Sequence, residues 1–265
     1  RPEPASLEWL HAVHPERYTT MIKSRCRVGE HVLDEGDTHV SKDSYDVALL
    51  AAGSVLLAVD RVMAGELDRA FCAVRPPGHH AGTSTVMGFC LFNNVAIGAR
   101  YAQLRYGLKR IAIVDWDVHH GNGTQQIFYE DSSVLYISLH QFPYYPGTGS
   151  TGERGAGPGE AFTLNCPMGA GSVEKDYLDA FQTHIRPALN NFRPEFLFIS
   201  AGFDAHKDDP LAGIHLTEES FARMTEELLD ITRESCGGQN VSVLEGGCNL
   251  QALARSVTAH LNAMM

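Results

Sequence analysis

Short apolar runs alternate with helix-length amphipathic segments along this chain, and this alternation most limits how it can fold. The apolar runs are residues 71–74, 111–115, 134–139, 196–201 and 241–244. The helix-length segments are residues 44–64, 92–106, 172–191, 217–235 and 249–263. Near-continuous apolar strands separated by helices are typical of a parallel sheet that is covered on both faces. The pattern therefore predicts an α/β fold: a doubly wound, mainly parallel sheet with helices on both faces.

The 265 residues are expected to form one domain, 1–265, because no linker, repeat or low-complexity tract divides them. With 44% hydrophobic and 20% charged residues, the composition argues against disorder and against a coiled coil. The Gly-rich stretch 146–159 is expected to be a long loop at one rim of the sheet. A phosphate loop is not expected there, because no Gly-Lys-Ser/Thr follows it and no helix opens.

Charge and cysteine content limit the partners and the compartment. A formal net charge of −11 argues against direct nucleic-acid binding, and it is compatible with a cationic ligand or with solubility alone. Six cysteines without a C-x-x-C pair predict a reducing compartment, the cytoplasm, or the nucleus in a eukaryote. The longest uncharged apolar stretch, 47–59, is too short to cross a bilayer, so no membrane partner is expected. Nothing in the pattern selects an oligomeric state.

Polar and titratable residues follow four of the predicted strands. His79 and His80 come after the first, Asp115 to Gly123 after the second, Asp204 after the fourth and Glu245-Gly-Gly-Cys248 after the fifth. Ligands of open α/β sheets bind outside the carboxyl ends of the strands. These residues are therefore expected to form one site at that edge of the sheet.

A metal ion is the first hypothesis for this site. Asp115, Asp117 and His119 are two residues apart, so an extended chain would point them to the same side. Together with Asp204, Asp117 and His119 supply two carboxylates and one imidazole, which suit Zn²⁺ and leave coordination positions open, as in catalytic sites. The alternative is that the Asp-x-Asp-x-His triplet only caps a helix. Asp204 at a second strand end favours the metal.

Proton transfer is assigned to the tandem histidines. A bound metal lowers the pKa of its water, and His79 and His80 could accept and donate the proton. Asp115 is a suitable orienting carboxylate, and Asn122 is a neutral one.

Five ordered motifs identify a family that this chain resembles. They are Arg75-Pro-Pro-Gly-His-His80, Gly88-Phe-Cys-Leu-Phe-Asn-Asn94, Asp115-Trp-Asp-Val-His-His-Gly-Asn-Gly123, Ser200-Ala-Gly-Phe-Asp204 and Leu244-Glu-Gly-Gly247. Together they resemble the zinc-dependent histone deacetylase superfamily, in its class II and bacterial histone deacetylase-like amidohydrolase branches, close to the acetylpolyamine amidohydrolases. The resemblance runs from about Leu7 to the end and implies an arginase/deacetylase-like fold.

The resemblance also implies roles for individual residues. One Zn²⁺ would be held by Asp117, His119 and Asp204. His80 would act as general base and then general acid, His79 would act electrostatically, Asp115 would orient His79, and Asn122 would face His80. Gly88, Phe89 and Tyr145 would line a tunnel for an acylated lysine, and Leu211 at the rim favours acyl-lysine over acylated polyamine. One or two K⁺ ions are implied, the first at Asp115, Asp117, His119, Ser138 and Leu139, the second at Phe128, Asp131 and Val134.

One position departs from the family pattern. In Glu245-Gly-Gly-x-Asn-Leu250 the family has Tyr at x, where this chain has Cys248. The tyrosine hydroxyl stabilises the oxyanion, and losing one such donor typically costs about 10²–10³-fold in rate. Three outcomes stay open: a slow deacetylase, an enzyme for other acyl groups, or a binding module for acyl-lysine or acylpolyamine with little turnover. Cys248 itself fits a small packing residue as well as it fits thiol chemistry.

Two further expectations complete the comparison with the family. An acetylpolyamine amidohydrolase is a second possible enzyme, whereas an arginase-like enzyme would need additional metal-bridging carboxylates that the motifs do not supply. Relatives have a further N-terminal segment before the region that matches residues 7–18. Because the sequence begins at Arg1 rather than Met, the domain as given is expected to lack that segment.

Overall fold

A computed structural model describes residues 1–34 and 36–265 and shows a single six-stranded sheet. Its strands are β1 (Arg69–Cys72), β2 (Ile111–Asp115), β3 (Val134–Gln141), β4 (Thr163–Met168), β5 (Phe196–Ala201) and β6 (Asn240–Leu244). Their spatial order is β1-β6-β5-β2-β3-β4, and each neighbouring pair is parallel. The predicted fold class is therefore confirmed.

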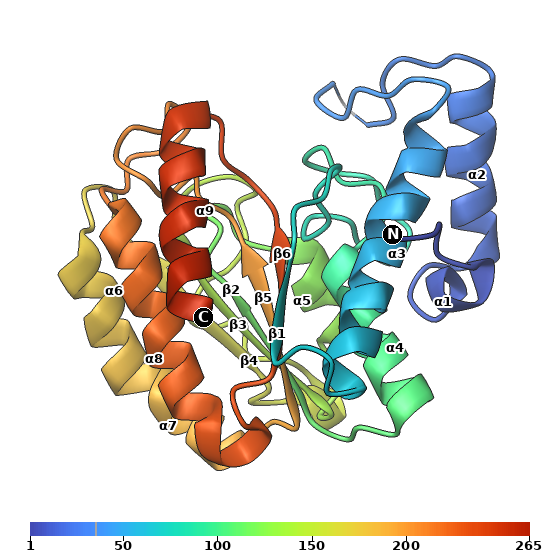
Figure 1. The fold of residues 1–265 in the computed structure, drawn as a ribbon. Coiled ribbons are helices and arrows are strands. Elements are labelled where there is room, and N and C mark those ends of the chain that lie inside the picture. Colours follow the sequence, from blue (N-terminus) through green and yellow to red (C-terminus); the bar gives the residue numbers. More distant parts are fainter. Residues whose placement is uncertain (35) are drawn as a thin grey trace.

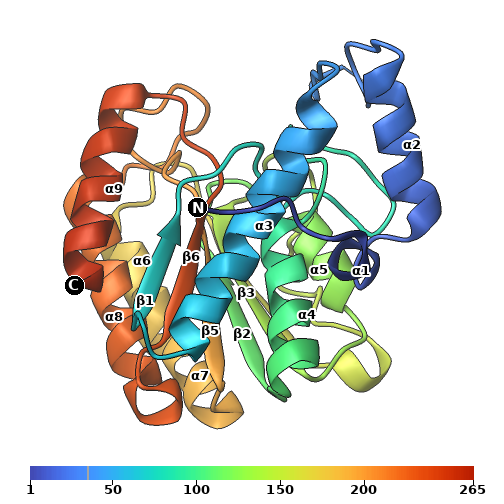
Figure 2. The same ribbon diagram turned by 45° about the vertical axis from the view of Figure 1, so that its right-hand side comes forward.

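Helices cover both faces of the sheet (Figures 1 and 2). One side carries α1 (Leu7–His11), α2 (Glu16–Arg27), α3 (Ser44–Met63), α4 (Asn94–Tyr106) and α5 (Asn122–Phe128). The other side carries α6 (Glu174–Ala180), α7 (Arg186–Phe192), α8 (Glu218–Cys236) and α9 (Leu250–Met264). Since all strands run in the same direction, the loops after their carboxyl ends meet at one edge, the top of Figure 1.

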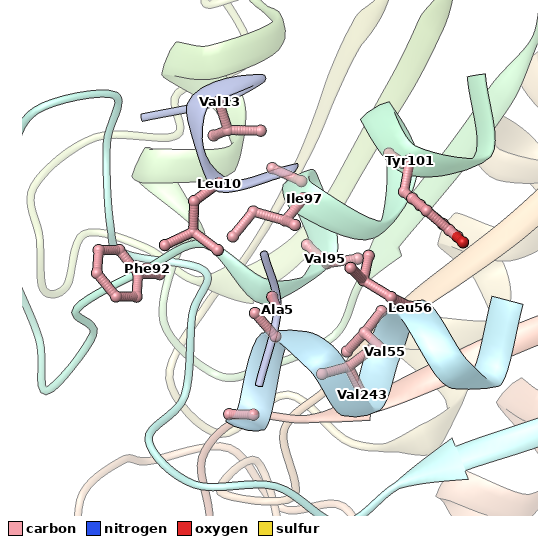
Figure 3. Close-up of a cluster of buried hydrophobic side chains, with 14 of the residues drawn as sticks. Ala5, Leu10, Val13, Val55, Leu56, Phe92, Val95, Ile97, Tyr101 and Val243 are labelled. Carbon is pink, nitrogen blue, oxygen red and sulfur yellow. The ribbon is translucent and has the colours of Figure 1, made fainter. Parts of the chain in front are cut away.

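Two apolar cores lie on either side of the sheet because successive strand residues point to opposite faces. Ile113 belongs to the core under α3 and α4, whereas its neighbour Val114 belongs to the core under α6–α9. Figure 3 shows part of the first core, where Val55 of α3 lies near Val243 of β6 and Leu10 of α1 lies near Ile97 of α4. Strands β2, β3 and β5 are fully buried, so the centre of the sheet gives the loops at its edge a rigid base.

The predicted elements and the observed ones differ in informative places. The predicted strand 71–74 lies at 69–72, and β4 was not predicted, because Asn165 and Pro167 interrupt its apolar pattern. Proline is tolerated in β4 because this strand lies at the edge of the sheet. The predicted helix 172–191 begins at Glu174 and contains a π-helical turn, Phe181–Ile185, between α6 and α7. Helices α1, α2 and α5 were not predicted either.

All six cysteines are unpaired. Among residues 1–34 and 36–265, no helix combines the length and the apolar character that crossing a bilayer requires.

Candidate active site

Three potential metal ligands converge after β2 and β5. These strands are neighbours, and Asp115 at the end of β2 pairs with Ser200 of β5, so the loops that follow lie side by side. One ligand atom each of Asp117, His119 and Asp204 lies within 4.8 Å of the others. Nδ1 of His119 is 3.0 Å from Oδ1 of Asp117 and 3.1 Å from Oδ2 of Asp204.

The route by which these residues meet differs from the expectation. Strand β2 ends at Asp115, and residues 117–119 lie in a bend rather than in extended chain. The expectation that an extended chain points Asp115, Asp117 and His119 to one side is therefore wrong. Backbone amides hold the carboxylates instead: Gly246 N donates to Asp117 Oδ2 at 2.8 Å, and Val118 N donates to Asp204 Oδ1 at 2.9 Å.

The chemistry of this donor set fits a divalent cation. Asp117 and Asp204 are buried, and buried carboxylates are stable when they are paired or when they coordinate a metal. Burial lowers the pKa of His119, but hydrogen bonds to Asp117 and Asp204 outweigh it and raise the pKa to about 11. Burial, reinforced by the charge of Asp117, raises the pKa of Asp204 to about 6. A cation would take the place of the His119 proton, since metal binding releases protons from its ligands.

The two tandem histidines lie beside this cluster, and their rings are 4.0 Å apart. Nδ1 of His79 is 3.0 Å from Oδ2 of Asp115, and Nδ1 of His80 is 2.8 Å from Oδ1 of Asn122. Both rings are nearly fully buried. The amide oxygen of Asn122 can only accept, so His80 carries its proton on Nδ1 and Nε2 is free to take up another.

The two rings are held in opposite protonation states. Burial opposes the charge on His79, but the carboxylates of Asp117 and Asp115 outweigh it and raise the pKa of His79 to about 10. Burial, reinforced by the charge of His79, lowers the pKa of His80 well below its usual value. At neutral pH the structure thus places a neutral imidazole, suited to accept a proton, next to an imidazolium.

Glu245 supports the histidines from below, and the sequence did not single it out beyond its place in a motif. Its buried Oε2 accepts hydrogen bonds from the backbone N–H groups of Gly78 at 2.7 Å and His79 at 3.1 Å. Ser200 Oγ donates to its Oε1 at 3.3 Å. Burial raises the pKa of Glu245 to about 7. The sequence signal that could have identified Glu245 is its position, a carboxylate directly after an apolar strand.

A cavity of about 360 Å³ opens above the cluster. The expected substrate residues Gly88, Phe89, Tyr145 and Leu211 line it together with the histidines, the potential metal ligands and Cys248. Gly88 has φ +56°, and an added Cβ would lie 2.4 Å from Cδ2 of His80, so the backbone approaches this ring closely. Asp37 and Arg75, which were not expected, also line the cavity.

Tyr144 is a further residue not expected from the sequence. Its ring stacks on His119, with centroids 5.8 Å apart and planes at 21°. Its hydroxyl donates to the backbone carbonyl of Leu211. The adjacent Tyr145 ring lies 5.3 Å from His80 and 5.9 Å from His119. The sequence signal that could have identified Tyr144 is the pair of aromatic residues in the loop after β3.

The remaining residues that are expected to bind K⁺ lie on β3 and around the loop that precedes it. Ser138 of β3 pairs with Asp115 of β2, and Leu139 is the next residue of β3. Phe128 ends α5, Val134 begins β3, and Asp131 lies in the loop between them, where its carboxylate is 2.6 Å from Arg100.

The fold and site define the class: an arginase/deacetylase-like α/β protein with a potential metal cluster at the carboxyl edge of its sheet. A family model described as the histone deacetylase domain matches residues 1–264. This chain belongs to the histone deacetylase family.

Individual relatives agree with this assignment. The chain is 42% identical to a probable deacetylase of Archaeoglobus fulgidus over 94% of its length and 69% of the relative's. It is 43% identical to a histone deacetylase-like amidohydrolase of Pseudomonas aeruginosa (92% and 64%) and 41% identical to a chloroplastic histone deacetylase 10 of Oryza sativa (99% and 62%). The chain therefore spans less than two thirds of the length of the Pseudomonas and Oryza proteins. The crystal structure of the HDA15 HD domain superposes with a TM-score of 0.94 at 40% identity, covering 100% of this chain and 75% of that one.

Proposed function

We propose that this protein hydrolyses the amide bond of N-acyl-lysine, or of a related acylated amine, in a zinc-dependent reaction. The observation that carries the proposal is the buried Asp117, His119 and Asp204 cluster, which shares a cavity with a neutral His80. Membership of the histone deacetylase family supports hydrolase activity. A single Zn²⁺ fits two carboxylates and one imidazole with coordination positions left open.

The residues of the chain divide the chemistry among them. When bound, the metal supplies a Lewis acid that polarises the acyl carbonyl and lowers the pKa of water. His80 takes the proton of the attacking water on Nε2 and later delivers it to the leaving amine. Asn122 holds the ring of His80, and Asp115 holds His79, whose positive charge stabilises the negative charge that develops nearby.

The walls of the cavity support acyl-lysine as substrate. Phe89 and Tyr145 present apolar surface to an alkyl stem, and Leu211 offers no charge to the second amine of a polyamine. Asp37 lies on the same cavity and would attract a cationic peptide. The related substrate class, acylated polyamines, remains the second candidate for the same chemistry. One or two K⁺ ions, at the positions named above, would support the loops.

Cys248 favours a second candidate function, an acyl-lysine binding module with little turnover. It lines the cavity where the family has the tyrosine that donates to the oxyanion. A thiol is a weaker donor on a shorter side chain, so turnover of acetyl-lysine should be slow. The Cys248→Tyr variant should raise that turnover by about 10²-fold if the missing donor is limiting. Isothermal calorimetry with acetylated peptides separates the candidates, because a binding module retains its ligand without releasing acetate.

The decisive experiment measures hydrolysis of fluorogenic acetyl-lysine and trifluoroacetyl-lysine peptides before and after treatment with a chelator. We expect chelation to abolish turnover and Zn²⁺ to restore it, with trifluoroacetyl-lysine cleaved faster because its carbonyl is more electrophilic. Metal content is measured on the same samples. Turnover that persists in metal-free protein would contradict the proposal.

A further inference from the structure

A buried carboxylate outside the catalytic cluster joins two walls of the cavity. Oδ2 of Asp209 accepts hydrogen bonds from Cys248 N at 2.7 Å and Asn249 N at 3.1 Å, and its Oδ1 accepts one from Leu211 N at 3.0 Å. Asp209 is only 6% exposed. Hydrogen bonds to an ionised acceptor are roughly twice as strong as neutral ones. One side chain thus holds both the loop that carries Cys248 and the turn that carries Leu211.

The same chain of hydrogen bonds continues to a third loop. The hydroxyl of Tyr144, in the loop after β3, donates to the carbonyl of Leu211, and the Tyr144 ring stacks on His119. Loops that follow β3, β5 and β6 are therefore connected beside the cavity through Tyr144, Leu211, Asp209 and Cys248. We call these four residues the mouth brace.

The segment that bears Asp209 is itself fixed from outside. Asn249 Nδ2 donates to the carbonyl of Asp208 at 2.9 Å, and Arg255 of α9 bridges Asp208 and Glu218, at 3.1 Å and 2.9 Å. This outer network does not use the Asp209 carboxylate. Removing that carboxylate would therefore release the Cys248 loop and the Leu211 turn while their frame stays in place.

We propose that the mouth brace sets the spacing between the Leu211 and Cys248 walls, and with it the size of the acyl group that the cavity admits. Asp209 is in this account a positioning residue, because it acts through the backbone of Cys248 and Leu211. Leu211 is 39% exposed and Cys248 is exposed, so core packing does not hold either side chain. Without the Asp209 carboxylate, the backbone N–H groups of Cys248 and Leu211 form hydrogen bonds with water instead, and the two walls move apart.

The first test needs no enzymatic activity. Cys248 is the exposed thiol, four other cysteines are buried and Cys236 is half-buried, so a maleimide reagent followed by peptide mass spectrometry reports on Cys248. Burial, reinforced by the negative charge of Asp209, raises the pKa of the Cys248 thiol. Labelling is therefore followed over pH, so that a change in this pKa is separated from a change in the plateau rate of the thiolate. We expect Asp209→Ala to raise the plateau rate about tenfold, since charge-assisted hydrogen bonds are lost.

Two milder variants keep this test decisive if Asp209→Ala does not fold. Asp209→Asn keeps one acceptor oxygen, and Tyr144→Phe keeps the ring on His119 while it removes the hydroxyl. We expect smaller increases in the plateau rate, in the order Asp209→Asn and then Tyr144→Phe. Plateau rates equal to that of the unmodified protein in all folded variants would overturn the proposal.

The second test rests on the proposed function and uses acetyl-, butyryl- and hexanoyl-lysine peptides. In Asp209→Asn and Tyr144→Phe the ratio of kcat/KM for hexanoyl over acetyl should rise about tenfold, mainly through a lower KM for hexanoyl. A loss that is equal for all three acyl groups indicates a merely structural role and would overturn the proposal. If the unmodified protein cleaves none of the peptides, the proposed function fails, and thiol labelling still decides whether the brace exists.

Discussion

The floor and the mouth of the cavity are built in opposite ways. On the floor, Asp115 and Glu245 are at most 5% exposed and each holds more than one hydrogen bond. At the mouth, Phe89, Tyr145 and Leu211 are 54%, 38% and 39% exposed. Polar groups buried at low dielectric must be fully partnered, whereas exposed apolar side chains carry no such demand.

We infer from this difference that residues on the floor determine the rate and that residues at the mouth determine which substrate is preferred. A change on the floor leaves a buried charge or hydrogen-bond donor without its partner, so it should reduce the rate for every substrate. A change at Phe89, Tyr145 or Leu211 alters the apolar wall of the cavity and leaves the buried polar groups partnered, so it should mainly change which substrate is preferred. Substitutions in the two regions test this division.

The largest effect should follow from Asp204→Asn. The substitution removes one of two carboxylates from the cluster and leaves His119 with one charged partner, so the affinity for a divalent metal falls steeply. We expect loss of bound zinc and a fall in kcat/KM of more than about 10³-fold. Atomic absorption and peptide hydrolysis measure the two effects. Asp179→Asn, on the exposed side of α6, is the control, and full zinc content in Asp204→Asn would contradict the assignment.

The second effect should follow from His80→Ala, which removes the proton acceptor but none of the potential metal ligands. General acid–base catalysis typically contributes about 10²–10⁴-fold, so kcat should fall within that range. Zinc content should stay unchanged, in contrast to Asp204→Asn. His184→Ala, an exposed histidine, is the control for loss of an imidazole. An unchanged kcat in His80→Ala would show that the proton leaves by another route.

A third prediction tests the boundary between floor and mouth. In Gly88→Ala the added Cβ would lie 2.4 Å from the His80 ring, so the ring must shift and kcat should fall about tenfold. Gly107→Ala is the matched control, because Gly107 also has a positive φ, +73°, but faces open space. The control should lose about 1 kcal/mol of stability and no activity. Equal kinetics for the two variants would show that His80 tolerates the displacement.

The smallest effect on turnover is expected for histidines outside both regions, which contribute to stability. Burial lowers the pKa of His14 and of His260 to about 4, whereas the unfolded chain has the ordinary value of 6.5. The neutral rings thus contribute stability above pH 6.5 that is lost as the pH falls toward 4, because the unfolded chain binds the protons first. We expect a loss on the order of 2 kcal/mol per histidine between pH 7 and pH 5.

Urea unfolding at several pH values measures this loss. In His14→Gln the pH dependence should be weaker, because one of the two groups no longer titrates. The same pH dependence in His14→Gln and in the unmodified chain would contradict the assigned role of His14.

Much of the fold could be predicted because its strands are buried on both faces and therefore read as apolar runs. β2 matches its predicted bounds, 111–115, and β5 matches 196–201. β4 could not be predicted in this way, because its position at the edge of the sheet tolerates Asn165 and Pro167, which interrupt its apolar run.

The potential metal ligands and the histidine pair could likewise be named in advance, since each follows a strand. Glu245, Asp209 and Tyr144 could not, because each has a partner that is a backbone group far away along the sequence. Glu245, for example, holds the N–H of Gly78, 167 residues earlier.

The sequence by itself determined which residue types stand at the end of each strand and hence the class of chemistry. Only the tertiary structure decided that β5 lies beside β2, so that Asp204 meets Asp117 and His119. It also decided the protonation states of the two histidines. His79 and His80 are adjacent and chemically identical, yet one faces carboxylates and the other an amide, and that difference arises only when distant segments pack together.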